Sequence, residues 1–454
     1  MLVFAGLAFL AGCSKRKPEA YAPDLLARVD GHEITTTEFV GRLRYVVSPD
    51  SLAALADTSR RARLLQDLID ERLAALYAEQ TGVVDSSDLR DALENVRRQA
   101  MLRELYLREV RDKAKVSKEE LRKAYRYWRQ ELTVAFYHAL TLEEAEWVRR
   151  GVLAGKSFAE LAGERYKRKF SEDQFRRKLR WGETDPALEA AAYALRVGEV
   201  SEPVKVGQVY YVVKLLNRRM LGSPSEEDFK RVAPALEKKL RRRKEDELAA
   251  RFLRQHLVQA GIQLRGPVLS ELVQYLGRYA GPDSIVELTP ETLDSLLAEF
   301  EWRDSALVVF SGKKWTVKEA LKRIEGVRLS AFSPELMADR LSRALFEAAR
   351  DEVLVEAAKD LGLDKHPRVQ RDVSVWRDYL ATEIFKRRAG TGRVLAVVDS
   401  LREHVPVLIF RTKLASLQFT SPDTTLGQQS TPFRQLAFPP WPVWDQERAT
   451  NPSR

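Results

Sequence analysis

Residues 195–219 read LRVGEVSEPVKVGQVYYVVKLLNRR, and this stretch decides how the middle of the chain folds. A segment with helical character, Pro186 to Leu195, leads into it. The β-branched and aromatic run from Val209 to Leu215 predicts a strand. A helix followed by a closing strand indicates the end of a small α+β domain.

The same domain begins upstream with a second strand. The run Val134–Leu140 (VAFYHAL) has strand character, and helices are predicted at Leu142–Ala154 and Phe158–Tyr166. Residues 164–180 are expected to be irregular, and they are strongly basic. We therefore place an α+β domain at residues 132–220.

Helical sequence surrounds this domain on both sides. Arg61 to Gln80 carries apolar residues at helical spacing and stops at Gly82. Further helices are predicted at 87–113, 118–128 and 225–259. The expected fold class is therefore mostly α, with one inserted α+β domain.

A repeat is visible in the helical part. Residues 27–39 (ARVDGHEITTTEF) predict a strand, a glycine turn and a helix start, and residues 310–319 (FSGKKWTVKE) repeat the pattern. Thr35 and Glu38 have the spacing of a capping box. Both copies also end alike, with LRQH before a short apolar run at 262–264 and LREH before another at 408–410. We interpret them as two copies of one helical module; chance similarity of two helical stretches is the alternative.

These patterns give a complete division of the chain. The predicted segments are a signal peptide at 1–12, a tether at 13–25, module 1 at 26–131, the α+β domain at 132–220, a helix returning to module 1 at 221–268, module 2 at 269–419 and a disordered tail at 420–454. The tail carries Phe433, Phe438, Trp441 and Trp444 beside prolines, so we also consider it as a docking segment.

The N-terminus predicts the compartment. Residues 1–12 are uncharged and apolar but too short to span a bilayer, which favours an export signal. Leu10-Ala11-Gly12-Cys13 resembles the lipobox of bacterial lipoproteins, which implies lipid attachment at Cys13; an ordinary buried cysteine is the alternative. Ser14 after the cysteine resembles the pattern for sorting to the outer membrane. We expect a lipid-anchored protein on the periplasmic face of the outer membrane, or on the extracytoplasmic face of the cell membrane.

Composition narrows the function classes. The 454 residues are 44% hydrophobic and 31% charged, which argues against a polytopic membrane protein and against a wholly disordered chain. The net charge of +10 would suit a nucleic acid, but export makes that partner improbable. One cysteine and five histidines give no disulfide framework and no His-rich metal site. No cofactor and no metal is expected.

Four blocks of the central domain carry a family resemblance. They are 141–146 (TLEEAE), 155–162 (GKSFAELA), 195–204 (LRVGEVSEPV) and 210–219 (YYVVKLLNRR). In this order they resemble a parvulin-type, or PpiC-type, peptidyl-prolyl isomerase domain. Helical modules around such a domain on a lipoprotein resemble the SurA/PrsA-type foldases. The resemblance implies an α+β fold and unfolded exported polypeptides as partners.

The resemblance also implies site positions. His138 matches the first of two strand histidines of the family, and Tyr211 stands where the second belongs. Lys178, in the segment 176–181 (RRKLRW), falls near the family's Cys or Asp position. Thr184 and Leu188 match the proline-pocket positions in place of larger apolar residues. A histidine kept only for strand packing is the alternative reading of His138.

Three functions remain open from the sequence. The first is a chaperone that binds unfolded exported chains, with a degraded isomerase site and basic rims at 164–180 and 241–244. The second is an active prolyl isomerase, and the third is a lipoprotein scaffold with one fixed partner, for which the Trp-rich tail is the candidate contact. No phosphate loop, metal cluster or Ser/His/Asp pattern indicates other chemistry.

Overall fold

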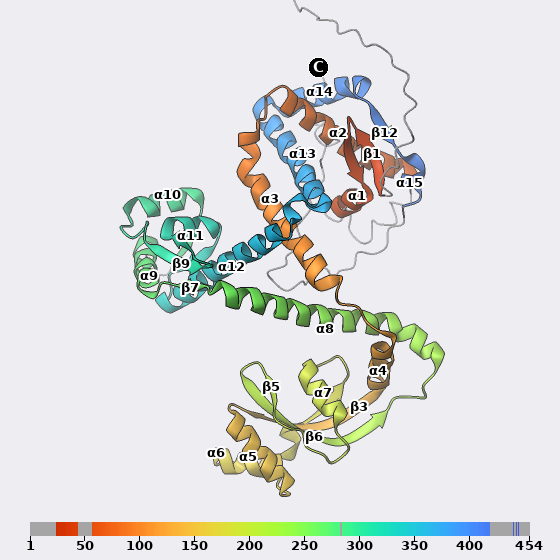
Figure 1. Ribbon diagram of the computed structural model, residues 1–454, viewed down its shortest axis with the longest axis vertical. Coiled ribbons are helices and arrows are strands. Elements are labelled where there is room, and N and C mark those ends of the chain that lie inside the picture. The colour runs from red at the N-terminus through yellow and green to blue at the C-terminus, as the bar shows by residue number, and fades with distance from the viewer. Residues whose placement is uncertain are drawn as a thin grey trace, which may run out of the picture. The chain divides into compact units, whose positions relative to one another are not determined.

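The computed structural model describes residues 24–43, 57–281 and 284–417, together with Pro439, Pro442 and Trp444. The chain divides into two compact units (Figure 1): one is Leu107–Gln255, and the other combines Met1–Tyr106 with His256–Arg454. Helices dominate and the sheets are small, so the predicted fold class is confirmed. Within the described ranges, no helix has both the length and the apolar character needed to cross a bilayer.

The unit 107–255 is built on one antiparallel sheet in the order β4-β3-β6-β5. Its strands are β3 (Gln130–Ala139), β4 (Arg176–Arg180), β5 (Val204–Val206) and β6 (Val209–Met220). Side chains alternate along β3, so Leu132 and Val134 belong to one core while Ala135 and Tyr137 belong to another. The expectation of irregular structure over 164–180 is wrong for Arg176–Arg180, which is an edge strand.

Helices cover both faces of this sheet. The helices α5 (Leu142–Leu153) and α6 (Phe158–Tyr166) build the core around Tyr137. On the other face lie α7 (Pro186–Ala194), α4 (Lys118–Trp128) and the first part of α8 (Glu226–Ala260). Because Tyr125 of α4 and Leu236 of α8 are buried in that core, α4 and most of α8 belong to this unit. Assigning them to module 1 was therefore wrong.

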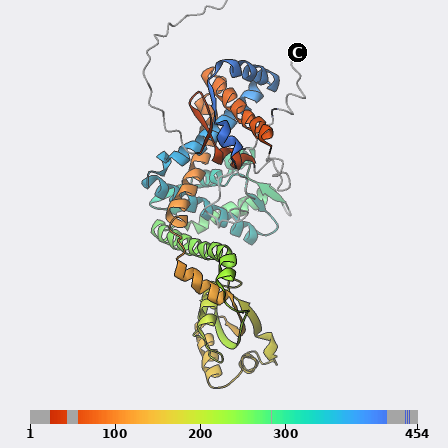
Figure 2. The same ribbon diagram turned by 90° about the vertical axis from the view of Figure 1, so that its right-hand side faces the viewer.

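The other unit contains the two predicted copies. In the first copy, the hairpin and helices lie beside the C-terminal helices in both views (Figure 1; Figure 2). Its elements are β1 (Leu25–Val29), β2 (His32–Thr35), α1 (Thr36–Leu43), α2 (Thr58–Gln80), α3 (Ser86–Tyr106), α13 (Pro367–Ala389), α14 (Thr391–His404), β12 (Val407–Ile409) and α15 (Arg411–Ala415). A π-helical turn, Leu107–Arg111, follows α3 at the start of the neighbouring unit.

The second copy has the same hairpin and helix start. Its elements are β7 (Gln263–Leu264), α9 (Gly266–Ala280), β8 (Ile285–Glu287), α10 (Pro290–Glu299), β9 (Ala306–Phe310), β10 (Lys313–Thr316), α11 (Val317–Arg323), β11 (Arg328–Ser330) and α12 (Pro334–Asp360). The two turns match residue for residue, because Asp30 and Ser311 both have positive φ and each precedes a glycine with positive φ.

The last strand of each copy pairs with the hairpin of the other copy from the one that we predicted. Strand β12 pairs with β1, in register Ala27 to Ile409, whereas β7 pairs with β9, in register Leu264 to Val308. The segment that follows the central domain therefore completes the second copy, and the C-terminal segment completes the first. The prediction that residues 221–268 return to module 1 is wrong.

The tail departs from the expectation of disorder at the residues that are described. Trp444 is buried in the core of the first copy, with only 1% of its surface exposed, and Pro439 and Pro442 are buried as well. The other aromatic residues of the predicted docking segment, Phe433, Phe438 and Trp441, lie outside the described residues. Cys13 does so too.

Candidate functional site

His138 and Tyr211 face each other across two neighbouring strands. The two residues are directly paired in the register of β3 and β6, and their ring centroids are 6.2 Å apart. The ring of Phe136, two residues before His138 on the same face of β3, meets Tyr211 edge-on at 6.4 Å. The sheet register therefore brings together the two residues that the resemblance selects.

A cavity of about 550 Å³ opens beside this pair. Aromatic side chains supply much of its wall, and Arg168, Gln174 and Arg177 add polar groups; the other lining residues are Phe136, Tyr137, His138, Ala162, Tyr166, Phe170, Phe175 and Tyr211. His138 is exposed and Tyr211 is half-buried, so both rings are accessible to a ligand. An apolar wall with few polar groups suits a proline ring and its adjacent amide.

Tyr137 fixes one wall of the cavity from the opposite face of β3. Its hydroxyl donates to Glu144 Oε1 at 3.3 Å, and its ring stacks on Phe175 with a centroid separation of 6.0 Å. Burial raises the pKa of the Tyr137 hydroxyl, so the group stays protonated and remains a donor. We assign this tyrosine a structural role.

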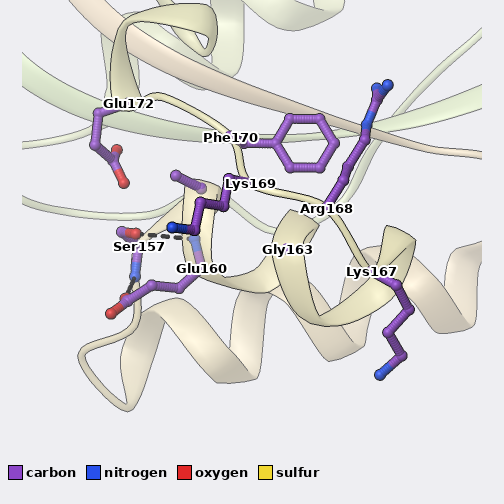
Figure 3. A pocket seen from close by; sticks show the side chains of 9 residues that line it. Ser157, Glu160, Gly163, Lys167, Arg168, Lys169, Phe170 and Glu172 are labelled. Atoms are coloured by element: carbon purple, nitrogen blue, oxygen red, sulfur yellow. Dashed lines mark hydrogen bonds between the residues drawn. The ribbon is translucent and has the colours of Figure 1, made fainter.

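A second hollow of about 740 Å³ lies next to α6 (Figure 3). Ser157 and Glu160 form a capping box at the start of the helix, which explains why α6 begins where the sequence predicts. The helix ends at Tyr166, and the next residue, Lys167, adopts the left-handed conformation. The chain then returns along the helix through Arg168, whose guanidinium lies 4.6 Å from the ring of Phe170. Arg168 and Phe170 line both this hollow and the cavity at His138.

Lys178 is not part of the site, contrary to the expectation. It pairs with Thr133 in the register of β4 and β3, well along β3 from His138. Its ammonium lies 3.8 Å from Glu131. Arg180 and Arg219 also contact that carboxylate, and the hydrogen bond from Arg180 is the main reason that the pKa of Glu131 is lowered. These cations therefore stabilise the sheet edge.

The two predicted proline-pocket residues do not line the cavity. Leu188 is buried in the core beneath α7, a core against which Tyr211 also packs. Thr184 precedes α7, and its backbone N–H donates to Glu189 Oε1 at 3.2 Å. The pocket wall is instead formed by aromatic residues that sequence reasoning missed, chiefly Phe136 and Phe175. The spacing of Phe136 and His138, two apart on one strand, was the available signal.

The basic run at 241–244 also has structural partners. Arg243 contacts the buried Glu189 at 2.8 Å, and its guanidinium lies 4.9 Å from the ring of Trp181. Lys244 contacts Glu120 at 2.7 Å, and Arg241 contacts Glu237 one helical turn away. The contacts of Arg243 and Lys244 hold α8 to α7 and α4, whereas the contact of Arg241 lies within α8. Arg243 and Lys244 therefore do not belong to a free basic rim of the kind that we expected.

Comparisons with known proteins identify the family of the central domain. Residues 116–250 match the family model of the PPIC-type PPIase domain, which includes the flanking helix α4 and much of α8. The chain is 24% identical to the foldase protein PrsA of Geobacillus kaustophilus over 285 residues, which are 59% of this chain and 94% of the relative. It is 29% identical to the foldase protein PrsA of Halalkalibacterium halodurans over 320 residues, which are 64% of this chain and 90% of the relative.

Solved structures give weaker matches. The PrsA structure of Bacillus anthracis is 18% identical, with a TM-score of 0.24, and the match covers 48% of this chain and 94% of that one. A SurA-like chaperone of Campylobacter jejuni is 19% identical, with a TM-score of 0.18, over 53% of this chain and 100% of that one. The match to the family model and the extent of the sequence relatives lead to one conclusion: the chain carries a parvulin domain of the PPIC type within a PrsA-like foldase.

Proposed function

We propose that this protein is a lipid-anchored, extracytoplasmic foldase that binds unfolded exported polypeptides and retains only a degraded prolyl isomerase site. The two PrsA relatives, which are covered over 94% and 90% of their length, are foldases by name. The apolar residues 1–12 followed by Cys13 support export and lipid anchoring.

One observation carries the proposal for the site. Tyr211, not a second histidine, faces His138 across β3 and β6. An isomerase has to lower a barrier of about 18–20 kcal/mol for rotation about the amide bond, and it needs polar groups around the twisting carbonyl to do so. A tyrosine hydroxyl supplies one donor, but Arg168 and Arg177 line the cavity and leave it strongly cationic. We therefore expect weak catalysis and a retained surface for binding peptides.

Exchange spectroscopy tests this directly. The rate of cis/trans exchange at an Xaa-Pro bond is measured by NMR in a short peptide with the Ser14–Arg454 protein. We expect little acceleration by the wild type, a gain in Tyr211→His and none in His138→Ala. Rapid exchange by the wild type that is lost in His138→Ala would instead establish an active isomerase, the second candidate function. The pairing of His138 and Tyr211 beside a cavity is the observation that favours that alternative.

Client binding requires a separate measurement. The protein is added in several-fold excess to an unfolded outer-membrane protein, and light scattering follows aggregation. Suppression is expected, because binding the unfolded chain keeps it soluble by mass action. Absence of suppression would contradict the chaperone function and leave the scaffold with one fixed partner. The burial of Trp444 within its own chain weighs against the tail as the scaffold's contact.

Anchoring is tested at Cys13. Cells that express the protein are labelled with a radioactive fatty acid, and membranes are separated by density. We expect label in the wild type and none in Cys13→Ser, with the wild type in the outer-membrane fraction. Equal labelling of both proteins would contradict the lipid anchor.

A further inference from the structure

Trp444 is buried among helices of the first copy that lie far from it along the chain, and we call the space that its side chain fills the groove. The side chain is 1% exposed and belongs to a core cluster with residues of α2, α13 and α14. Its indole Nε1 donates to the backbone carbonyl of Asp67 at 2.9 Å. The Lys386 ammonium lies 4.4 Å from the ring centroid. The groove therefore offers an indole three kinds of contact: apolar packing for the ring, a hydrogen-bond acceptor for the N–H and a cation over the π-face.

Small side chains create the room for this ring. Ala74, Ala75 and Ala78 follow one another on α2 and are all buried, and Phe385 comes from α13. Because alanine side chains are small, they leave room in this cluster for the large indole ring of Trp444. Pro439 and Pro442 are buried ahead of Trp444, so the seated segment is an aromatic residue that follows prolines.

The rest of the first copy is held together without this segment. Helices α2 and α13 contact each other directly through the stacked rings of Tyr77 and Phe385, whose centroids are 5.6 Å apart. Thr382 of α13 donates to the carbonyl of Glu71 of α2 at 3.1 Å. Strand β12 closes the sheet on β1. These contacts all lie before residue 418, so none of them involves Trp444.

We propose that this groove is a binding site for a tryptophan that follows prolines in an unfolded polypeptide, and that the chain's own C-terminal segment occupies it as a built-in competitor. The client part of this proposal rests on the proposed chaperone function; the occupancy of the groove does not. A tethered segment competes at an effective concentration on the order of 1 mM. If the tail segment itself binds the groove with a dissociation constant of about 100 µM, a client segment would bind about tenfold more weakly in the presence of the tethered tail.

Removal of the tail tests the site. A chain that ends at Leu417 is titrated with a fluorescent peptide of residues 438–448 (FPPWPVWDQER), and anisotropy measures binding. We expect binding to the shortened chain and about tenfold weaker binding to the full chain. The peptide with Trp444→Ala is expected not to bind. Equal binding of both peptides, or no binding of either, would overturn the proposal.

Two substitutions in the groove provide a matched comparison. Lys386→Gln in the shortened chain removes the cation over the ring and should weaken peptide binding several-fold. Arg387→Gln removes an exposed charge of the same kind at the next position, and no change is expected. Similar losses in the two variants would mean that general charge attraction, not the groove, holds the peptide.

Two further outcomes separate this proposal from the chaperone function. If the shortened chain no longer unfolds cooperatively, Trp444 is an ordinary core residue and the proposal fails. In the full chain, Trp444→Ala should increase affinity for reduced, carboxymethylated α-lactalbumin about tenfold. If the tail peptide binds but that unfolded protein does not bind any variant, the chaperone function fails and the groove stands as the site of an intramolecular contact only.

Discussion

The two copies of the repeated module carry the same motif, but its charged residues are buried in the first copy and exposed in the second. Thr35-x-x-Glu38-x-x-x-Arg42 in the first copy corresponds to Thr316-x-x-Glu319-x-x-x-Arg323 in the second. In both copies the threonine hydroxyl accepts the backbone N–H of the glutamate at 3.2 Å, which caps the helix. Glu38 and Arg42 are buried, whereas Glu319 and Arg323 are exposed.

In the second copy the two charged side chains lie at the surface and contact residues close to them in the chain. Glu319 completes the capping box by accepting the backbone N–H of Thr316 at 2.8 Å. Arg323 lies 4.3 Å from the ring of Trp315. The core behind them consists of apolar side chains such as Leu341 and Leu345 of α12.

In the first copy the same charges hold distant segments together. Arg42 donates two hydrogen bonds to Glu71, at 2.6 and 2.8 Å, and Arg72 donates to Glu38 at 2.9 Å. Arg72 also contacts Asp378 of α13. A buried charge is costly without partners, and α13 gives Arg72 of α2 a second carboxylate besides Glu38. We infer that this ionic cluster selects α13 as the closing partner of the first copy.

The largest expected difference between the copies comes from the paired arginines. Arg42→Ala leaves Glu71 buried without its partner, and breaking a buried pair in this way costs about 3–5 kcal/mol. Arg323→Ala removes an exposed contact with Trp315, and a loss below about 1 kcal/mol is expected. Urea unfolding of both variants measures this. Similar losses would show that the buried cluster has no special importance for stability.

A second prediction concerns how the stability of the first copy depends on pH. Asp372 of α13 is buried beside Arg103, and burial raises its pKa from 3.8 to about 6 in spite of that arginine. A raised carboxyl pKa gives a contribution to stability that is complete below pH 3.8 and is lost as the pH rises to about 6. The shift corresponds to about 3 kcal/mol.

The matched variant for this test is Asp372→Asn. The difference in unfolding free energy between the wild type and this variant should fall as the pH rises through that range. A difference that stays constant with pH would mean that Arg103 fully offsets the burial of Asp372.

The two motif glutamates should respond to pH with opposite signs. Burial raises the pKa of Glu38, against the effect of Arg72 and Arg42, so its contribution is present below its usual value of 4.5 and declines as the pH rises. The backbone N–H of Thr316 lowers the pKa of Glu319, so its contribution is present above 4.5 and declines as the pH falls.

Glu38→Gln and Glu319→Gln isolate these two contributions. Unfolding free energies measured across the acid range should give wild-type minus variant differences of opposite slope. Slopes of the same sign would contradict the inference that Glu38 and Glu319 have pKa values shifted in opposite directions.

The smallest effect is the one that the copies share. Thr35→Ala and Thr316→Ala each remove a helix cap of the same geometry, and each should cost about 1 kcal/mol. Thermal unfolding compares the two, with Thr37→Ala, an exposed neighbour, as the control. A much larger loss in Thr35→Ala would show that the cap and the ionic cluster of the first copy act together.

Local sequence signals predicted much of this protein. The bounds of α4 and α6 agree with the prediction because Ser117 and Ser157 cap them through side chains only three residues away. The repeat and the central domain were visible for the same reason. Of the site, the pair His138 and Tyr211 followed from the strands and the family resemblance, whereas Phe175, Arg168 and Arg177 come from loops and an edge strand that the sequence pattern did not indicate.

Contacts between distant segments decided the rest. The runs LRQH and LREH are nearly alike, so nothing in either predicts which hairpin the following strand joins. The pairing depends on long-range contacts, such as Arg61 with the carbonyl of Ala415 at 2.7 Å, and Arg72 with Asp378. Likewise, the composition of the tail predicts disorder, because the groove that accepts Trp444 exists only in the folded chain. Sequence thus determined the elements, because their signals are local, and tertiary structure determined their partners, because burial of charge and apolar surface is a property of the assembled chain.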